Sequence, residues 1–254
     1  MYYCYKDLKT KFDLYVRLTL IIGFFIVYFL YSTEHIHNKL YLIVFSCILV
    51  VSFLIVINRW YRKKNKEILF YNLDLNSWEQ FININNRDPL KSNRTTAEIA
   101  SIRYAYMIGD FGTVINKAKL LIIDAKLNQQ VREEIEYFYL SATILSKNNQ
   151  TELNCEEFLL ESASYNENKN KISERISAIY DITVKHRTNP YFRGKTDKNK
   201  FSKLEILYFE ALNNILETDL LGGRKKLIEI VKEDDRLYFV KQAKRILEEL
   251  KDDK

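Results

Sequence analysis

The sequence predicts an all-α protein: an N-terminal two-helix transmembrane hairpin followed by a cytoplasmic array of α-helical hairpins. Two long apolar runs lie within the first 58 residues, and apolar residues recur with a helical period from about residue 95 onward. Strand-like alternation is almost absent outside the apolar runs. We therefore expect a cytoplasmic tail (1–17), a transmembrane hairpin (18–58) with a short outer loop (34–39), a basic connector (59–94) and a helical domain (95–254).

The second apolar run, Leu40 to Asn58, has 19 uncharged residues, fourteen of them Leu, Ile, Phe or Val. As a helix rising about 1.5 Å per residue it would cover about 28 Å, close to the roughly 30 Å hydrocarbon core of a bilayer. Each of these fourteen residues favours insertion by about 0.3–0.6 kcal/mol at the helix centre. The run is therefore expected to span a membrane.

The first apolar run, Leu18 to Thr33, is shorter at 16 residues. It reaches the required length if the helix extends back through residues 14–16 and Arg17 directs its guanidinium toward the lipid headgroups. A cleaved signal peptide is the alternative, because the preceding tail is basic. The residues after the run contain no small-x-small cleavage pattern and a second apolar run follows, so an uncleaved anchor is the better interpretation.

The positions of the cations predict the orientation of the hairpin. Four cations precede the first run, only Lys39 lies in the loop, and five follow the second run. Because positive charge near span ends stays in the cytoplasm, both termini are expected to be cytoplasmic in a two-pass cell-membrane protein. Trp and Tyr suit headgroup depth, and cations beside them face anionic lipid. The residues expected at the membrane interface are Arg17, Arg59, Trp60, Tyr61, Arg62, Lys63 and Lys64.

The connector of residues 59–94 has apolar residues with an irregular period, and Trp78 and Phe81 lie three positions apart. It fits a short helix lying on the membrane surface beside the cations. The preferred interpretation is that it caps the first helical hairpin and buries Trp78 in the helical domain.

The helical domain shows both apolar stripes and helix-end signals. The clearest stripe runs from Leu204 to Leu216, and it must pack on a neighbouring element. Thr95 with Glu98 and Ser202 with Glu205 fit capping boxes, in which the hydroxyl accepts a backbone N–H. Short connections make successive helices antiparallel neighbours. The expected breaks are Gly109-Asp110, residues 147–151, Asn189-Pro190 and Gly222-Gly223.

The stretch RYAYMIGDFGTVINKAKLLIIDA, Arg103 to Ala125, resembles the centre of a tetratricopeptide repeat. In that family a helix ends at a Gly-Asp-aromatic turn, which Gly109, Asp110 and Phe111 match, and Ala118 falls on the packing face of the next helix. The resemblance implies a stacked helical surface that binds a peptide or protein partner, and a compact helical bundle is the alternative. The sequence departs from the family at Ile102, Val114 and Lys126, where Gly, Ala and Pro are usual.

The sequence contains no recognisable catalytic, cofactor or metal motif. The six glycines form neither G-x-G-x-x-G nor a phosphate loop, and H-E-x-x-H and G-x-S-x-G are absent. Cys4, Cys47 and Cys155 lack C-x-x-C spacing, and His35 with His37 falls short of the three or four ligands of a zinc site. We therefore expect no catalytic residues, no cofactor and no metal.

Residues 59–254 hold 34 cations and 30 anions, a near-balance that does not favour a nucleic-acid binder. The favoured function is a membrane-anchored helical adaptor, not an enzyme, which holds a protein or peptide partner at the cytoplasmic face of a bacterial membrane. One alternative is an immunity protein whose hairpin meets a membrane-active peptide, by analogy alone. Another is an enzyme whose site has no recognisable motif.

Overall fold

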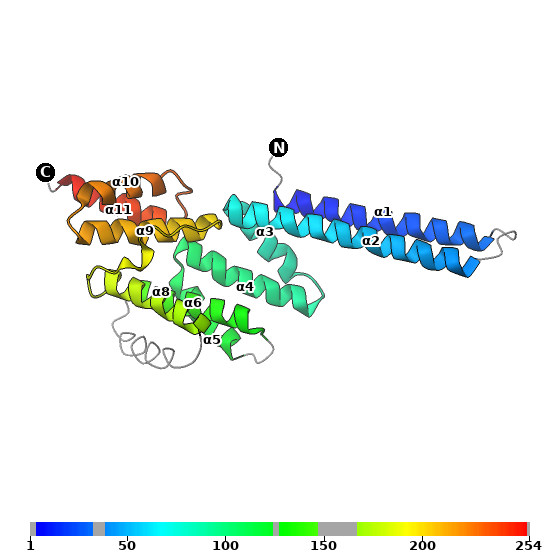
Figure 1. The fold of residues 1–254 in the computed structure, drawn as a ribbon, viewed down its shortest axis with the longest axis horizontal. Helices are drawn as coiled ribbons and strands as arrows, with labels where there is room; N and C mark the ends of the chain where they lie inside the picture. The colour runs from blue at the N-terminus through cyan, green and yellow to red at the C-terminus, as the bar shows by residue number, and fades with distance from the viewer. Residues whose placement is uncertain (1–3, 33–38, 124–126, 147–166, 253–254) are drawn as a thin grey trace. The chain divides into compact units, whose positions relative to one another are not determined.

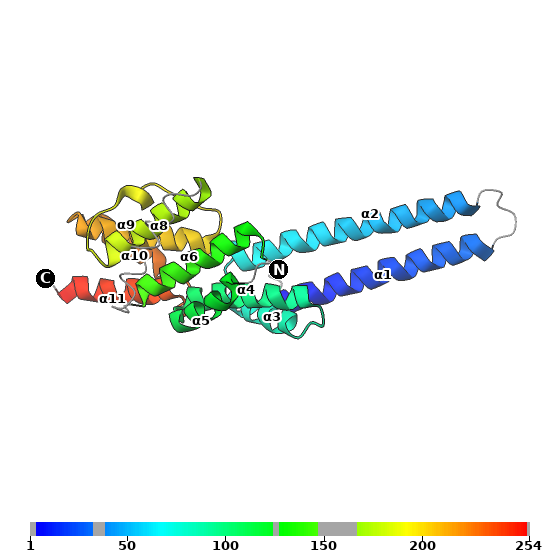
Figure 2. The same ribbon diagram turned by 90° about the horizontal axis from the view of Figure 1, so that it is seen from below.

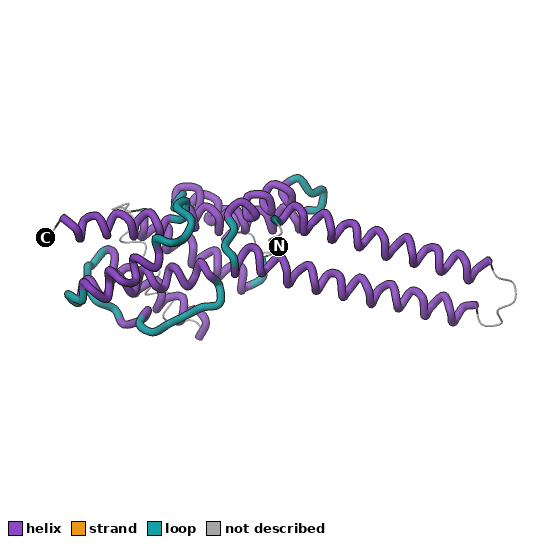
Figure 3. Tube along the Cα trace, turned by 90° about the horizontal axis from the view of Figure 1, so that it is seen from above, coloured by secondary structure: helices purple, strands orange, loops and turns teal. Residues whose placement is uncertain are grey.

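The computed structural model describes residues 4–32, 39–123, 127–146 and 167–252. These residues form ten α-helices, one π-helical turn and one 3₁₀ turn, and no strand occurs among them (Figure 3). The predicted all-α class is therefore confirmed. The chain forms two compact units, Met1–Phe81 and Ile82–Lys254. Of the residues considered above, Thr33, His35, His37, Ala125, Lys126, Cys155 and the expected break at 147–151 lie outside the described ranges.

The N-terminal unit is built on a pair of long helices. Helices α1 (Tyr5–Ser32) and α2 (Lys39–Lys66) lie side by side and antiparallel (Figures 1 and 2). The π-helical turn η1 (Glu67–Tyr71) and helix α3 (Leu75–Asn86) follow. A Cβ placed on Gly23 would lie 2.5 Å from Val50 Cγ2, so this glycine lets the two helices approach closely.

Two helices are long and apolar enough to cross a membrane, Tyr5–Ser32 and Leu40–Tyr71, the second including η1. Their apolar side chains point outward: Phe24 is 69% exposed and Val56 is 63% exposed. Exposure of so much apolar surface to water is unfavourable in free energy. Residues 5–17, expected as a separate tail, form the first half of α1.

The N-terminus of α1 is capped by side chains of α3. The backbone N–H of Tyr5 donates to Ser77 Oγ at 3.1 Å, and that of Lys6 donates to Gln80 Oε1 at 3.0 Å. The first N–H groups of a helix have no partner within the helix, so these contacts satisfy two of them. The buried Tyr5 ring meets Phe81 edge-on, with centroids 5.0 Å apart. Helix α3 thus fixes where α1 begins.

Trp78 is buried, as expected, but its contacts belong to the N-terminal unit. Its Nε1–H donates to the carbonyl oxygen of Leu69 at 2.8 Å, and its ring meets Phe70 edge-on at 5.3 Å. The expectation that Trp78 is buried in the helical domain is therefore not met. A tryptophan needs both apolar surface and an acceptor for its N–H, and the turn η1 supplies both.

The C-terminal unit consists of helices that pack consecutively along the chain. The last helix, α11, also contacts the first helix, α4, and it contacts α9 as well (Figures 1 and 2). The elements are α4 (Lys91–Ile108), α5 (Phe111–Ile122), α6 (Gln129–Leu145), α8 (Glu167–Thr183), the 3₁₀ turn η3 (Pro190–Phe192), α9 (Lys200–Leu216), α10 (Leu220–Ile230) and α11 (Tyr238–Asp252).

The turn between α4 and α5 lies where the sequence predicts it. Gly109 ends α4 with φ 86°, a left-handed conformation that favours glycine. Asp110 caps α5, and its Oδ1 accepts the N–H of Thr113 at 3.2 Å. Phe111 is buried and meets the Tyr238 ring edge-on at 4.8 Å. A Cβ on Gly109 would lie 2.7 Å from Tyr238 Cδ2, so α11 covers this turn closely.

Both predicted capping boxes are wrong. Helix α4 begins at Lys91, so Thr95 lies inside it. Helix α9 begins at Lys200, and Asn199 caps it by accepting the N–H groups of Phe201 and Ser202 at 3.0 and 3.4 Å. The capping-box pattern has only two fixed positions, so it also occurs inside helices, where the backbone N–H groups already have partners.

The glycine pair Gly222-Gly223, predicted as a break, lies inside α10. The chain turns earlier, at Thr218 with φ 66°, and Asp219 caps α10 by accepting the N–H of Gly222 at 2.9 Å. A Cβ on Gly223 would lie 3.0 Å from the carbonyl oxygen of Ala211. The second glycine therefore serves close packing of α10 on α9 instead of ending a helix.

We expect Gly109→Ala to destabilise the C-terminal unit more than Gly194→Ala does. Both glycines have a positive φ, so alanine costs about 1–2 kcal/mol of conformational energy at either position. Nothing lies within 4 Å of a Cβ on Gly194, whereas a Cβ on Gly109 meets Tyr238. Thermal unfolding of the full chain in detergent, followed by circular dichroism, measures the difference. Equal losses of Tm would contradict the close packing of α11 on this turn.

Candidate functional site

Of the residues expected at the membrane interface, Arg17 lies near the middle of α1, whereas the others lie near the end of α2: Arg59, Trp60, Tyr61, Arg62, Lys63 and Lys64. Each helix has 28 residues and is about 42 Å long, which exceeds a hydrocarbon core of about 30 Å. Part of each helix therefore extends beyond the apolar band. Lys64 Nζ pairs with Glu67 Oε2 at 2.8 Å. The side chains of Arg17, Arg59, Arg62 and Lys63 are exposed.

Trp60 and Tyr61, expected at headgroup depth, both contact α1. The Trp60 ring meets Tyr15 edge-on at 5.8 Å, and the Tyr61 ring lies 4.3 Å from Phe12. The hydroxyls of Tyr61 and Tyr5 are 2.9 Å apart and share a hydrogen bond. These aromatic contacts fix the register of the two helices just beyond their apolar parts.

A buried carboxylate joins four helices of the C-terminal unit. Glu205 on α9 accepts hydrogen bonds at Oε1 from the hydroxyls of Tyr106 on α4 and Tyr137 on α6, each at 2.7 Å. Its Oε2 pairs with Arg175 Nη2 on α8. The Glu205 side chain is 2% exposed. These four residues, the Glu205 cluster, tie together helices that are distant in sequence.

Arg175 is held on two sides. Besides its ion pair, its guanidinium carbon lies 4.7 Å from the centroid of the Tyr137 ring, a cation–π contact. Burial disfavours the guanidinium charge, but the Glu205 carboxylate and the nearby tyrosines together more than offset this, so the pKa of Arg175 lies above its usual value. Its Nε is buried without a hydrogen-bond partner in the described part of the protein.

The tyrosines of the Glu205 cluster are held protonated. Burial raises the pKa of Tyr106 well above 10.0, and the Glu205 charge raises it further. Burial also raises the pKa of Tyr137, although the Arg175 charge opposes this. Protonated hydroxyls can donate to the carboxylate, whereas two phenolates could not. Both tyrosine hydroxyls therefore donate to the Glu205 carboxylate.

The Glu205 cluster has no room for a substrate, because both carboxylate oxygens are occupied and the side chain is buried. The arrangement is suited to joining helices, not to acid–base chemistry. The sequence prediction assigned Glu205 to a capping box and missed its role. The signal that could have identified it is its position within a run of large apolar residues, FSKLEILYFEAL, where a charge must find a partner.

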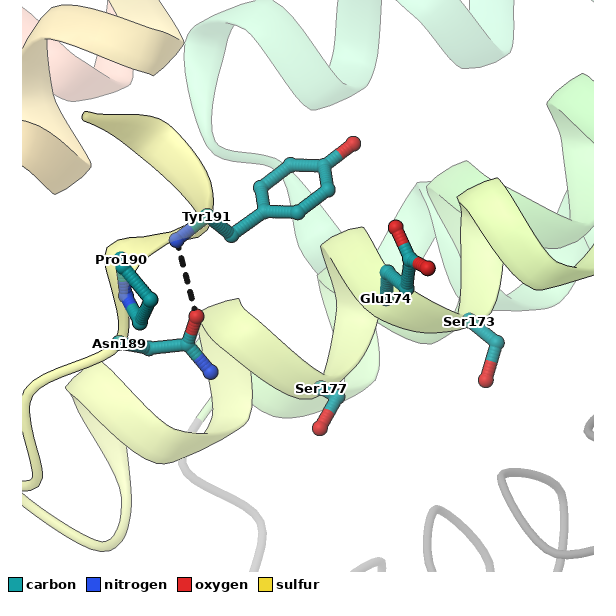
Figure 4. Close-up of a pocket in the computed structure, with 6 residues that line it drawn as sticks. All are labelled: Ser173, Glu174, Ser177, Asn189, Pro190 and Tyr191. Atoms are coloured by element: carbon teal, nitrogen blue, oxygen red, sulfur yellow. Dashed lines mark hydrogen bonds between the residues drawn. The ribbon is translucent and has the colours of Figure 1, made fainter. Parts of the chain in front are cut away.

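A second polar feature of this unit is open to solvent. A hollow of about 490 Å³ lies between α8 and η3, and we call it the α8 hollow. Figure 4 shows the Tyr191 ring extending over α8 on the side where the Glu174 carboxylate projects. The predicted break at Asn189-Pro190 forms one wall. The lining residues are Ser173, Glu174, Ser177, Asn189, Pro190 and Tyr191.

Comparisons with protein families, curated proteins and solved structures give no match to this chain. The resemblance to tetratricopeptide repeats thus rests on the sequence around the α4–α5 turn. There Ala118 and Val114 are both fully buried, so Val114 packs although the family usually has Ala at that position. Within the described residues, no group of three or more His, Cys, Asp or Glu side chains could hold a metal ion.

We expect Glu205→Gln to destabilise the C-terminal unit strongly, because it leaves the Arg175 charge without its partner. Breaking a buried ion pair costs about 3–5 kcal/mol, and the cost here should lie at the lower end because the Arg175 side chain is 23% exposed. Chemical denaturation of the full chain in detergent measures the loss.

The double substitution Arg175→Met with Glu205→Gln should recover much of that loss, because it removes the unpaired charge. The matched control is Glu249→Gln, which breaks the Arg245–Glu249 pair, whose side chains are 58% and 61% exposed. That control should cost less than about 1 kcal/mol. A double variant no more stable than Glu205→Gln would contradict the ion pair as the cause.

Alkaline pH should weaken the C-terminal unit through Tyr106 and Tyr137. The folded protein keeps their protons, whereas the unfolded chain loses them near pH 10, so the free energy of unfolding falls as pH rises above that value. Their contribution is fully present below about pH 10. Tm measured from pH 8 to 11 should fall less steeply for Tyr106→Phe with Tyr137→Phe than for the unaltered chain or for Tyr139→Phe. Identical slopes would contradict this.

Proposed function

We propose that the protein is a membrane-anchored helical adaptor. In this proposal α1 and α2 cross the bilayer, and the C-terminal unit holds a protein or peptide partner at the cytoplasmic face of the membrane. The observation that carries the proposal is the outward-facing apolar surface of the α1–α2 pair, on which Phe24, Phe29 and Tyr28 are each more than 60% exposed. Lipid tails can cover such a surface, and water cannot do so favourably.

The distribution of charge supports the proposed orientation. The end of the hairpin where α1 begins and α2 ends carries nearly all the cations of the first 66 residues. Basic residues near span ends favour the cytoplasmic side, and exposed cations attract anionic lipid. Both termini and the C-terminal unit are therefore placed in the cytoplasm by this proposal, and the loop of residues 34–39 outside.

The C-terminal unit is inferred to be a compact bundle instead of an open solenoid. In a solenoid each repeat contacts only its neighbours, whereas α11 here contacts α4, and Lys241 Nζ donates to the carbonyl oxygen of Ile108 at 3.2 Å. The unit also leaves apolar side chains exposed: Leu120 at 75% and Leu221 at 83%.

A proximity-labelling enzyme fused to the C-terminus of the full chain tests the adaptor function. We expect labelling of cytoplasmic proteins at the membrane, with at least one protein enriched over a control in which residues 1–81 carry the same enzyme. Replacement of Arg59, Arg62, Lys63 and Lys64 with Gln should reduce cytoplasmic labelling, because the positive charge that orients the hairpin is lost.

The matched control for this charge removal replaces Lys225, Lys232, Lys244 and Lys251 with Gln; all four belong to the C-terminal unit and follow the two apolar helices in the sequence. Labelling outside the cytoplasm by the unaltered chain would overturn the orientation. A labelled set identical to that of the residue 1–81 control would overturn the adaptor function. A chain that fractionates with soluble proteins would overturn the membrane anchor.

A further inference from the structure

The wall of the α8 hollow that carries Tyr191 is held rigidly. Asn189 donates its backbone N–H to Asn213 Oδ1 and its Nδ2–H to Asp181 Oδ2, both at 2.8 Å. Its Oδ1 accepts the N–H of Tyr191 at 3.0 Å. The next residue, Phe192, is fully buried and stacks on Phe209. The position of Tyr191 is therefore fixed from both sides, and a ligand would meet a preformed surface.

The α8 hollow presents a carboxylate and an aromatic ring to solvent. Glu174 is exposed, and no Lys or Arg whose side chain the structure describes lies within the ion-pair distance of 4.0 Å from its carboxylate. Tyr191 is half-buried and lies close enough to interact with the Glu174 charge. A carboxylate beside an aromatic ring attracts cations both by its charge and by the negative face of the ring.

A cation of this chain already makes a cation–π contact with the Tyr191 ring. Lys195 Nζ lies 3.0 Å from the ring centroid. Burial lowers the pKa of Lys195, and although the Glu174 carboxylate opposes this, the nearby Arg175 charge lowers it further. The ring thus accepts an ammonium group at this position. Lys195 is exposed and has a long, flexible side chain, so it can move into water when another cation takes its place.

We propose that the α8 hollow binds a lysine or arginine side chain presented by a protein partner. The cationic group of the partner lies between the Glu174 carboxylate and the Tyr191 ring, and it replaces the Lys195 ammonium there. One cation at an open carboxylate contributes little by itself, which suits one contact within a longer interface better than a tight small-molecule site. This inference rests on the proposed adaptor function, and it identifies the chemistry of the partner as a basic segment.

The test uses the full chain in nanodiscs with a single 3-fluorotyrosine at position 191 and records its ¹⁹F resonance. The probes are Nα-acetyl-lysine methylamide and its uncharged analogue Nα-acetyl-norleucine methylamide. We expect a saturable shift with the lysine probe alone. Glu174→Gln should weaken that binding by about threefold, because it removes the charge that attracts the probe. Lys195→Met should strengthen it severalfold, because it removes the internal competitor.

Glu98→Gln, which alters an exposed carboxylate on α4, is the matched control and should leave binding unchanged. Circular dichroism verifies that each variant is folded. The proposal is overturned if the lysine probe gives no saturable shift or if norleucine binds equally well. It is also overturned if Nα-acetyl-glutamate methylamide binds more tightly or if Lys195→Met weakens binding.

These results are separable from the adaptor function itself. If the lysine probe binds but proximity labelling enriches no partner, the adaptor function is contradicted and the cation site is supported. The opposite outcome is an enriched partner whose labelling is unaffected by Glu174→Gln, with no shift of the ¹⁹F resonance on addition of the lysine probe. That outcome would contradict the cation site and support the adaptor function.

Discussion

The C-terminal unit depends on one buried interaction, the carboxylate of Glu205 and its three partners. Leucine or phenylalanine at this position could pack against many neighbours in many ways, but a buried carboxylate is tolerated only where its oxygens find donors. The required donors come from Tyr106, Tyr137 and Arg175, on three other helices. An arrangement of α4, α6, α8 and α9 that separates any of them from Glu205 leaves a polar group unpaired in the core. The cluster therefore favours one arrangement over others of similar apolar burial.

Two neighbouring residues of α8 show how one helix serves both core and surface. Successive residues of a helix point about 100° apart. Arg175 consequently reaches inward to Glu205, while Glu174 projects into the solvent-exposed α8 hollow. The inner charge has a fixed partner and the outer charge does not, so only the outer one is available to a ligand. The buried cluster also holds α8 in place, and with it the position of Glu174 relative to η3.

The N-terminal unit meets the opposite physical problem. Its apolar side chains face outward along α1 and α2, and its polar contacts are concentrated at one end, where α3 caps α1 and Tyr61 meets Tyr5. The first backbone N–H groups of α1, which have no partner within the helix, thus find acceptors on α3. These contacts join residues near positions 5, 61 and 77, and together with the close approach of α1 and α2 at Gly23 and Val50 they fix the register of the hairpin.

The sequence by itself determined the all-α class, the two apolar helices, the α4–α5 turn and the burial of Trp78. Each of these follows from a local pattern: a long apolar run, a helical period, a glycine at a left-handed position, or a large amphipathic ring. Helix starts were predicted less well, because a capping pattern such as Ser202 with Glu205 recurs inside helices and the true cap, Asn199, lies only one turn earlier.

Only the tertiary structure decided the partners of these residues. The caps of α1 come from Ser77 and Gln80, which stand 72 and 74 positions from their donors. The donors to Glu205 lie 30 to 99 positions away. The α8 hollow likewise joins residues of α8 to η3 across an intervening loop. Such pairings arise because a buried polar group needs a hydrogen-bond or ion-pair partner close to it in space. The packing of the helices decides which residues lie close enough to serve as that partner.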